Sequence, residues 1–263
     1  MNEVNKTLFI PLYGKALVSK KRIIITDKKA EQIWEKEAFP IKGKSKSKWL
    51  AYYMAMRARI FDDWTDKMLQ QCPDSLILHI GCGLDSRHER VDGSYAEWID
   101  ADFMDVISVR KKYFQESSIY HMIGMDVSET DEINSLPPAN CVIVILEGIS
   151  MYLQNSELKR LLETIQEKYP EVHILMDVYT EFAAKASKYK NPVNDVGVTE
   201  LYGVDDVECL VADNRLNVKA EHSLTPDYLV DELEGFEKSF FRVMFTGSLA
   251  RKIYRLYEFE TAK

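Results

Sequence analysis

The sequence predicts an α/β fold with a mostly parallel sheet that helices cover on both faces. The first observation is alternation, because short apolar, β-branched runs are separated by amphipathic segments with helical periodicity. The second is size and composition. The chain has 263 residues, of which 46% are hydrophobic and 29% charged, enough for one large core, and no Pro/Gly/Ser-rich linker or internal repeat divides it.

Five strands are predicted from the apolar runs. Each run is short and bounded by polar turn residues, a pattern typical of strands buried on both faces of a parallel sheet. The strands are expected at Leu76–Ile80, Ala96–Ile99, Tyr120–Ile123, Cys141–Leu146 and Val172–Val178.

Two helices are predicted from apolar residues at helical spacing. One begins at Ser156, a residue type that favours the N-cap, and buries a leucine-rich stripe that ends near Ile165. The other covers Trp49–Leu69, directly before the first strand. Its apolar face carries Tyr53, Ile60, Phe61, Trp64 and Met68.

Two arginines of the Trp49–Leu69 helix are expected on opposite faces. Arg57 lies on the apolar face, where a guanidinium needs an anionic partner. That partner is either a ligand carboxylate or a structural carboxylate, unless the side chain reaches solvent. Arg59 is about 200° around the helix from this face. Its neighbours there are acidic and predict surface ion pairs: Asp62, Asp63 and Asp66.

The charge of the chain excludes several partners. A net charge of −8 and a pI near 5.3 argue against binding to nucleic acid or anionic lipid. Met1–Tyr13 has no signal-peptide pattern, and no apolar run is long enough to span a membrane. We therefore expect a cytoplasmic protein with a small-molecule substrate. The oligomeric state does not follow from the sequence.

Cysteine and histidine spacing gives no indication of a metal site. Cys72, Cys82, Cys141 and Cys209 are scattered and form no CxxC pair, and the five histidines show no ligand spacing. The sequence therefore predicts a reduced protein without a bound metal ion.

The strongest candidate site follows the first predicted strand. Gly81 and Gly83 flank Cys82 there, and glycines allow a tight turn and a close approach of ligand to backbone. Asp100 and Asp102 lie about twenty residues further on, the separation at which an acid meets a ribose in nucleotide-binding folds. A dinucleotide fingerprint would have a third glycine where Ser86 stands. Its absence favours S-adenosylmethionine, which has no phosphate, over NAD.

Acidic residues follow four successive predicted strands. In open α/β sheets ligands bind at the carboxyl ends of strands, so these acids are expected to share one site, although any one of them could be a helix cap. They are Asp85, Asp102, Asp126 and Glu147. Asp177 ends a fifth strand, and its role is left open.

Four ordered motifs resemble the leucine carboxyl methyltransferase family, within it the branch of tetracenomycin-type polyketide O-methyltransferases. They are HIGCGLDSRHERV, WIDADFMDVISVRKKY, IGMDVSE and ILEGISMYL, between Trp49 and Val178, with a looser match at Tyr254–Glu260. Residues 180–221 show no clear match to the motifs of this family. Ser86 replaces the usual Thr, and the insertions of the phosphatase-directed branch are missing, which puts a protein substrate in doubt.

The resemblance implies a class I S-adenosylmethionine-dependent methyltransferase, with a Rossmann-like seven-stranded sheet, helices on both faces and the last strand antiparallel. It implies one domain over residues 1–263, in which a helical segment of about residues 1–70 covers the cofactor site.

The resemblance also assigns contacts with the cofactor, S-adenosyl-L-methionine. Arg57 would bind its carboxylate, Asp102 rather than Asp100 its ribose, and Asp126 and Val127 would frame its adenine. Glu147 would lie beneath the amino-acid end, and Gly81 and Gly83 would form the turn. A lysine is expected from among Lys15, Lys20 and Lys21.

The acceptor and the catalytic residues stay open. An O-methyltransferase acting on a carboxylate needs no general base, whereas one acting on a hydroxyl does. Tyr152 and Asp177 are candidates for the acceptor side, and no base is assigned. A non-catalytic member of the same fold and an NAD-dependent oxidoreductase are the alternatives.

Overall fold

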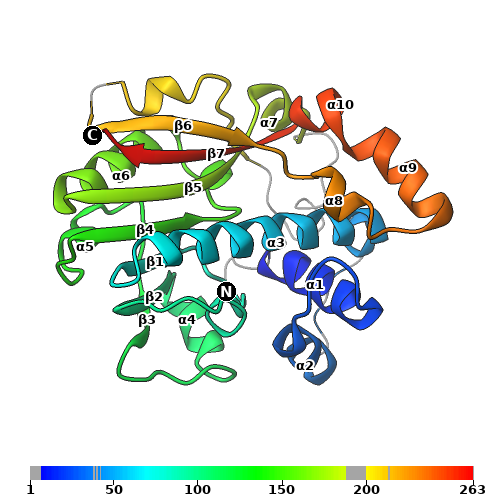
Figure 1. Ribbon diagram of the computed structural model, residues 1–263, viewed down its shortest axis with the longest axis horizontal. Coiled ribbons are helices and arrows are strands. Elements are labelled where there is room, and N and C mark those ends of the chain that lie inside the picture. The colour runs from blue at the N-terminus through cyan, green and yellow to red at the C-terminus, as the bar shows by residue number, and fades with distance from the viewer. Residues whose placement is uncertain are drawn as a thin grey trace.

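A seven-stranded sheet forms the centre of the molecule (Figure 1). The structure is a computed structural model that describes residues 7–37, 39, 41, 43–187, 200–212 and 214–262. The strand order is β3-β2-β1-β4-β5-β7-β6, with β1 to β5 parallel and β7 antiparallel to both β5 and β6. The strands are β1 (Leu76–Ile80), β2 (Glu97–Asp102), β3 (Tyr120–Gly124), β4 (Cys141–Leu146), β5 (Glu171–Tyr179), β6 (Leu216–His222) and β7 (Tyr254–Thr261).

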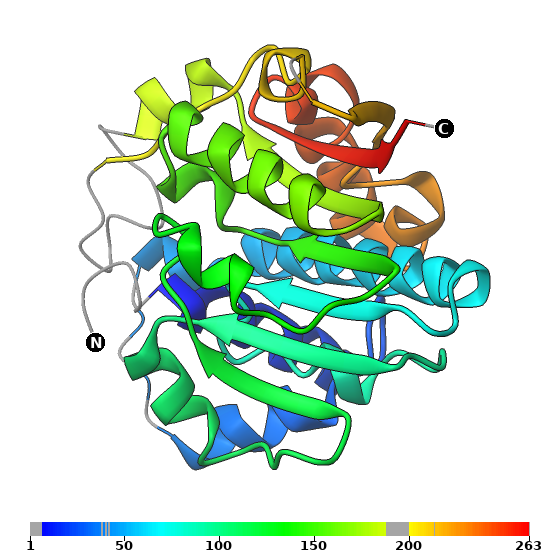
Figure 2. The ribbon, with the colours of Figure 1, turned by 90° about the vertical axis from the view of Figure 1, so that its left-hand side faces the viewer.

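Helices pack on both faces of this sheet (Figure 2). The longest, α3, is buried against one face, and α6 is buried against the other. The helices are α1 (Phe9–Lys21), α2 (Lys28–Lys36), α3 (Lys48–Gln71), α4 (Met104–Arg110), α5 (Asp131–Asn134), α6 (Asn155–Lys168), α7 (Glu181–Ser187), α8 (Asp227–Val230), α9 (Gly235–Phe245) and α10 (Gly247–Arg251).

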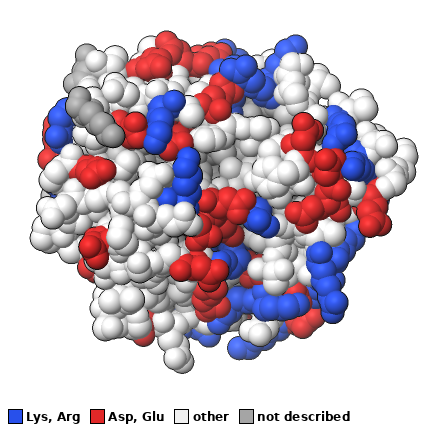
Figure 3. All heavy atoms as spheres, viewed as in Figure 1, with Lys and Arg blue, Asp and Glu red and all other residues white. Residues whose placement is uncertain are grey.

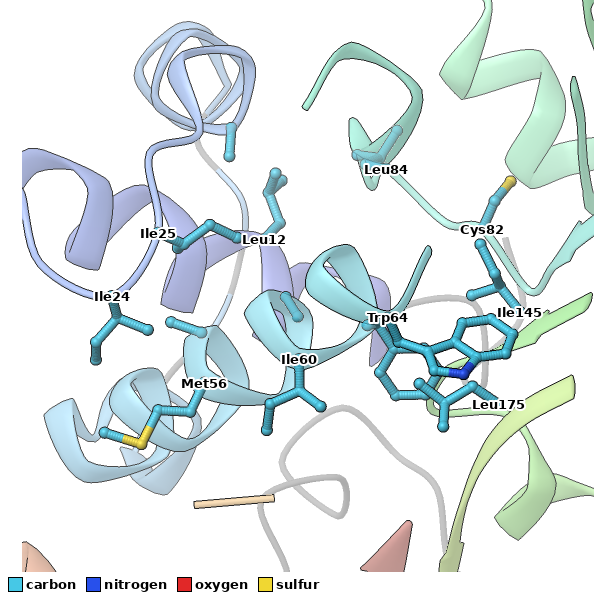
Figure 4. Packing of buried hydrophobic residues seen from close by; sticks show 14 of the residues in the cluster. Leu12, Ile24, Ile25, Met56, Ile60, Trp64, Cys82, Leu84, Ile145 and Leu175 are labelled. Carbon is cyan, nitrogen blue, oxygen red and sulfur yellow. The ribbon is translucent and has the colours of Figure 1, made fainter. Parts of the chain in front are cut away.

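The core has two parts because successive side chains of a strand point to opposite faces. On the α3 side, Trp64 packs with Ile145 of β4 and Leu175 of β5 (Figure 4). On the other side, Val144 and Ile174 pack with the leucine stripe of α6. Both faces of the central strands are therefore dry, which explains why their sequences read as unbroken apolar runs.

All five predicted strands are present. β1 and β4 have the predicted bounds, whereas β2 continues three residues beyond Ile99 to Asp102. β6 was not predicted. It is an edge strand in which, after Leu216, exposed residues such as Lys219 and Glu221 alternate with half-buried ones, so it has no apolar run to detect.

The predicted start of α6 at Ser156 is wrong by two residues. Gln154 is the N-cap, and its side chain and that of Glu157 form a reciprocal capping box. Ser156 is the second residue of the helix. The sequence favoured it because serine is the commoner N-cap type, whereas here the glutamine takes that role.

Before the sheet, the described chain is helical. α1 and α2 pack beside α3, and residues 1–6 of this segment lie outside the described residues. On the face shown in Figure 3, acidic and basic side chains are interspersed. No helix in the described ranges is long and apolar enough to cross a membrane.

Candidate cofactor site

A cavity of about 980 Å³ lies at the carboxyl ends of β1, β2 and β4. Its wall is formed by the turns that follow these strands and by residues of α1 and α3. Every residue that the sequence assigned to cofactor binding lines this cavity. These residues are Arg57, Gly81, Gly83, Asp102, Asp126, Val127 and Glu147.

The glycine turn after β1 depends on left-handed backbone conformations. Gly81 has a φ of 71° and Gly83 a φ of 52°. Residues other than glycine rarely adopt such positive φ values. A Cβ on Gly81 would also lie 2.1 Å from Cγ2 of Ile149. Position 81 therefore requires glycine for two reasons: its backbone has a positive φ, and Ile149 leaves no room for a Cβ atom.

Asp102 joins the end of β2 to the glycine turn. Its Oδ2 accepts a hydrogen bond from the backbone N–H of Gly83 at 2.8 Å, and its Oδ1 accepts one from Phe103 at 2.8 Å. Burial raises the pKa of this carboxyl to about 6, although both hydrogen bonds act to lower it. The carboxylate is thus held in place with each oxygen still able to accept another bond.

Asp100 has a different, structural environment. It is fully buried and pairs with Arg110, while Tyr120 and the indole of Trp98 donate hydrogen bonds to it. It does not line the cavity. Two residues apart in a strand, Asp100 and Asp102 belong to the same face of β2, so their position along the strand makes them differ. Asp102 lies just where the strand ends and its carboxylate can turn back to Gly83.

Asp126 and Val127 follow β3 and line the same cavity. Oδ1 of Asp126 accepts hydrogen bonds from the backbone N–H of Ser128 at 3.0 Å and from its hydroxyl at 2.7 Å. The loop is therefore fixed by its own residues, and the side chain of Val127 provides an apolar surface at this end of the cavity.

Arg57 points into the interior from α3, as its place on the apolar face predicted. Its Nε donates to Oε1 of Glu147 at 2.9 Å, and its Nη1 donates to Oδ2 of Asp177 at 3.0 Å and to the hydroxyl of Tyr254 at 2.9 Å. One of the partners that the sequence left open for Arg57, a structural carboxylate, is thus present in Glu147 and Asp177. Nη2 has no hydrogen bond to any residue that the structure describes, and a Cβ on Gly148 would lie 3.1 Å from it.

Glu147 is held by two arginines. Besides Arg57, it pairs with Nη2 of Arg87 at 2.5 Å. Burial alone would raise the pKa of Glu147, but the two guanidinium charges outweigh burial and hold the pKa well below its usual value. Glu147 is therefore an anion that lines the cavity, and no pattern in the sequence indicated Arg87 as its partner.

Of the three candidate lysines, Lys15 lies at the cavity. It is buried, and its Nζ is 2.6 Å from Oδ2 of Asp85. Lys20 pairs with Glu35 at the surface, and Lys21 donates to the hydroxyl of Tyr52. The choice depends on the packing of α1 against the glycine turn, which the spacing of the lysines does not reveal.

Two acidic residues near the site, Asp177 and Asp62, lie elsewhere than the sequence predicted. Asp177 is fully buried behind Arg57 and accepts a hydrogen bond from the backbone N–H of Gly148, so it supports the site without lining it. Arg59 pairs with Asp63 at 2.7 Å as expected. Asp62, however, turns inward and pairs with Arg87, because the acidic stripe reaches the edge of the buried face.

The cavity opens to solvent at Phe182 and Met244, which line it and are exposed, and the lining around them is apolar and aromatic. Most of its lining residues there come from α3, α7 and the end of α9, segments distant in sequence. They include Trp49, Tyr53, Tyr152, Phe182, Met244 and Phe245. Only Tyr152 among these was proposed from the sequence as an acceptor-side residue. Burial raises the pKa of Tyr152 and of Tyr53, so both hydroxyls are protonated at neutral pH.

Known proteins resemble this chain in sequence. The model of the leucine carboxyl methyltransferase family matches residues 2–166. The tetracenomycin polyketide synthesis O-methyltransferase of Streptomyces glaucescens is 28% identical over 209 residues, which are 79% of this chain and 77% of that protein. An S-adenosyl-L-methionine-dependent methyltransferase of Gibberella zeae is 26% identical over 178 residues, covering 62% of this chain and 60% of the relative.

Solved structures share the fold. A protein from Thermobifida fusca YX described as a methyltransferase candidate superposes with a TM-score of 0.62 at 12% identity, covering 97% of this chain and 94% of that one. Magnesium protoporphyrin IX methyltransferase from Synechocystis PCC 6803 with bound SAH gives 0.51 at 9% identity, covering 84% and 90%. The predicted fold class is thereby confirmed.

Proposed function

The chain belongs to the leucine carboxyl methyltransferase family, and we propose that it transfers the methyl group of S-adenosylmethionine to an oxygen atom of a small organic acceptor. The family match confirms the resemblance in the sequence motifs and, with it, an S-adenosylmethionine-dependent methyltransferase. One observation carries the proposal for the site: residues from five separate segments meet at one cavity, where Asp102 is bound to the glycine turn.

We propose that the nucleoside part of the cofactor lies between β1, β2 and β3. The free lone pairs of Asp102 would accept hydrogen bonds from the two ribose hydroxyls. Gly81 and Gly83 lack the Cβ atoms that would block a close approach. Val127 and the loop fixed by Asp126 would hold the adenine, which needs an apolar surface with polar groups at its edge.

The amino-acid part would lie near Arg57. Nη2 is the guanidinium nitrogen left for the cofactor carboxylate, and Lys15 brings a second positive charge to the same end of the cavity. Glu147 would face the cofactor ammonium group. Because Glu147 and Asp177 already hold Arg57 in one orientation, little side-chain entropy would be lost on binding.

The residues of the chain would contribute mainly by alignment. S-adenosylmethionine supplies a methyl group on a sulfonium, which an oxygen nucleophile attacks in line, leaving S-adenosylhomocysteine. The described helices α1 and α3, whose residues line the cavity, would cover the site and exclude water from it. The N-terminal helical segment thus has a role in closing the cofactor site.

We propose an acceptor with an apolar or aromatic body and an acidic oxygen. The mouth offers aromatic rings for the body. His79 is the one histidine that lines the cavity within the described ranges, and it is bonded to Asp100 with its pKa lowered by burial. The tyrosines are protonated donors. An acceptor oxygen that is ionised at neutral pH, such as a carboxylate, would need no base from the protein.

A turnover assay with the full chain tests this function. The chain is incubated with S-adenosylmethionine and either aromatic carboxylic acids, phenols or amines of similar size, and the methylated products are identified by mass spectrometry. We expect O-methylated products from the acids or the acidic phenols. Methylation of the amines alone would contradict the proposal, and cofactor binding without turnover on any panel would favour the non-catalytic alternative.

A further inference from the structure

Four side chains of metal-ligand type meet at the end of the sheet opposite the cavity. They come from the C-terminus of α3 and the first residues of β4 and β5, and one ligand atom of each lies within 4.8 Å of the others. The four residues are Cys72, Cys141, Glu171 and His173. They are distant in sequence, which is why cysteine and histidine spacing gave no indication of the cluster.

The fold brings these residues together through strand register. Cys141 is the direct partner of Glu171 in the parallel pair β4–β5, and His173 lies two residues further along β5 on the same face. α3 packs on that face and ends at the edge where β4 and β5 begin (Figure 1). Cys72, its C-cap, is held there by a bond from its N–H to Met68.

The distances are close to those of a tetrahedral site. Bonds of about 2.3 Å to sulfur and about 2.0–2.2 Å to nitrogen or oxygen place neighbouring ligand atoms about 3.4–3.8 Å apart. Sγ of Cys72 is 3.9 Å from Nε2 of His173, and Oε1 of Glu171 is 3.0 Å from the same nitrogen. Shifts of a few tenths of an ångström would bring these pairs to the ideal separation.

His173 is oriented for this role. Its Nε2 points to the cluster, whereas its Nδ1 is buried and has no hydrogen-bond partner in the described part of the chain. Oε2 of Glu260 lies 4.0 Å from Nδ1, and Lys219 holds Glu260 at 2.7 Å. A metal-bound histidine commonly directs its other nitrogen to a carboxylate, which fixes the ring and its tautomer.

We propose that Cys72, Cys141, His173 and Glu171 bind one zinc ion or a similar divalent cation. Two sulfur ligands and an imidazole suit zinc, whereas magnesium and calcium require oxygen ligands. The ion would tie the end of α3 to the starts of β4 and β5. α3 also carries Arg57, which lines the cavity. The ion would therefore secure the C-terminal end of the same helix that contributes Arg57 to the cofactor site. The site is separate from methyl transfer.

Cobalt(II) is the probe for this site, because four-coordinate cobalt with thiolate ligands gives intense visible bands and a sulfur-to-metal band. The full chain, reduced and stripped of metal, is titrated with cobalt and then with zinc. We expect both bands at one cobalt per chain, their loss when zinc is added, and a higher melting temperature with zinc than with magnesium.

Variants locate the ion. Cys72→Ser and Cys141→Ser should each weaken or remove the sulfur-to-metal band, whereas Cys209→Ser, at an exposed cysteine outside the cluster, should bind as the wild type does. Glu260→Gln should lower zinc affinity about 10- to 100-fold. Wild-type protein that binds no cobalt, or binds it equally well in all three cysteine variants, would overturn the proposal. So would a Cys72–Cys141 disulfide that persists under reducing conditions.

Discussion

Nε of Arg57 donates a hydrogen bond to Oε1 of Glu147 at 2.9 Å, joining the middle of α3 to the end of β4. Asp177 and Tyr254 hold the same guanidinium through Nη1. Arg57 is therefore both a structural ion-pair partner and a lining residue of the cavity, where the sequence had offered these as alternatives. This double role determines what its replacement should do.

Replacing Arg57 with Met should abolish most cofactor binding and also destabilise the fold. From the sequence alone, Met is expected to preserve the fold because it keeps the aliphatic stem. The structure changes this expectation, because Asp177 would be left buried without its cationic partner and Glu147 would keep only Arg87, at a cost of about 3–5 kcal/mol. Chemical denaturation gives the stability, and calorimetry below the melting temperature gives the affinity.

Arg59→Met is the matched control on the same helix. The pair between Arg59 and Asp63 is exposed, and such pairs contribute under about 1 kcal/mol. Cofactor affinity should stay within a few-fold of wild type. If Arg57→Met bound the cofactor as the wild type does, Nη2 would have no part in binding.

Asp102→Ala should weaken binding of S-adenosylhomocysteine about 10- to 150-fold, because hydrogen bonds to a charged group contribute about 1.5–3 kcal/mol. Asp100→Ala should instead lower stability, since Arg110 would lose its buried partner, and leave affinity less changed. Calorimetry and thermal melting of both variants separate the two effects. A larger loss of affinity in Asp100→Ala would place the ribose elsewhere.

Cofactor affinity should fall below about pH 6. The folded-state pKa of Asp102 is raised to about 6 by burial, so the carboxylate is protonated below that pH and loses its charge as an acceptor. If only the ionised form binds, the dissociation constant should rise about tenfold per pH unit below 6 and level off above it. Titrations between pH 5 and 8 measure this. Asp102→Asn should bind weakly with a flat profile, and an unchanged slope in that variant would assign the titration to another group.

Gly81→Ala should destabilise the protein more than Gly235→Ala. Both residues have positive φ, which costs an alanine about 1–2 kcal/mol. A Cβ on Gly235 meets nothing within 4 Å, whereas on Gly81 it would overlap Ile149, adding about 1–3 kcal/mol. The difference in denaturation midpoint isolates the steric part. Equal losses would mean that Ile149 moves away without cost.

Local patterns explain what the sequence could predict. β1 and β4 were located because both of their faces are buried, and the inward direction of Arg57 followed from helix periodicity alone. The preference for Asp102 over Asp100 came from the family motif. The structure adds a physical reason, because only Asp102 is at the strand end where it reaches Gly83.

Contacts between distant segments could not be read from spacing. Lys15 was indistinguishable from Lys20 and Lys21 until α1 was packed against the glycine turn. The inward turn of Asp62 depends on Arg87, a residue from another element. The cluster around His173 likewise depends on the register of β4 with β5. In each case the deciding partner comes from another segment of the chain.

The assignment of the cavity to S-adenosylmethionine is tested by isothermal titration of the unmodified chain with S-adenosylhomocysteine, and separately with NAD. We expect S-adenosylhomocysteine to bind at one site per chain and, at a hundred times its dissociation constant, to stabilise the fold by about 2.7 kcal/mol. NAD should give no binding heat. Stoichiometric binding of NAD with no binding of S-adenosylhomocysteine would contradict the assignment of the cavity.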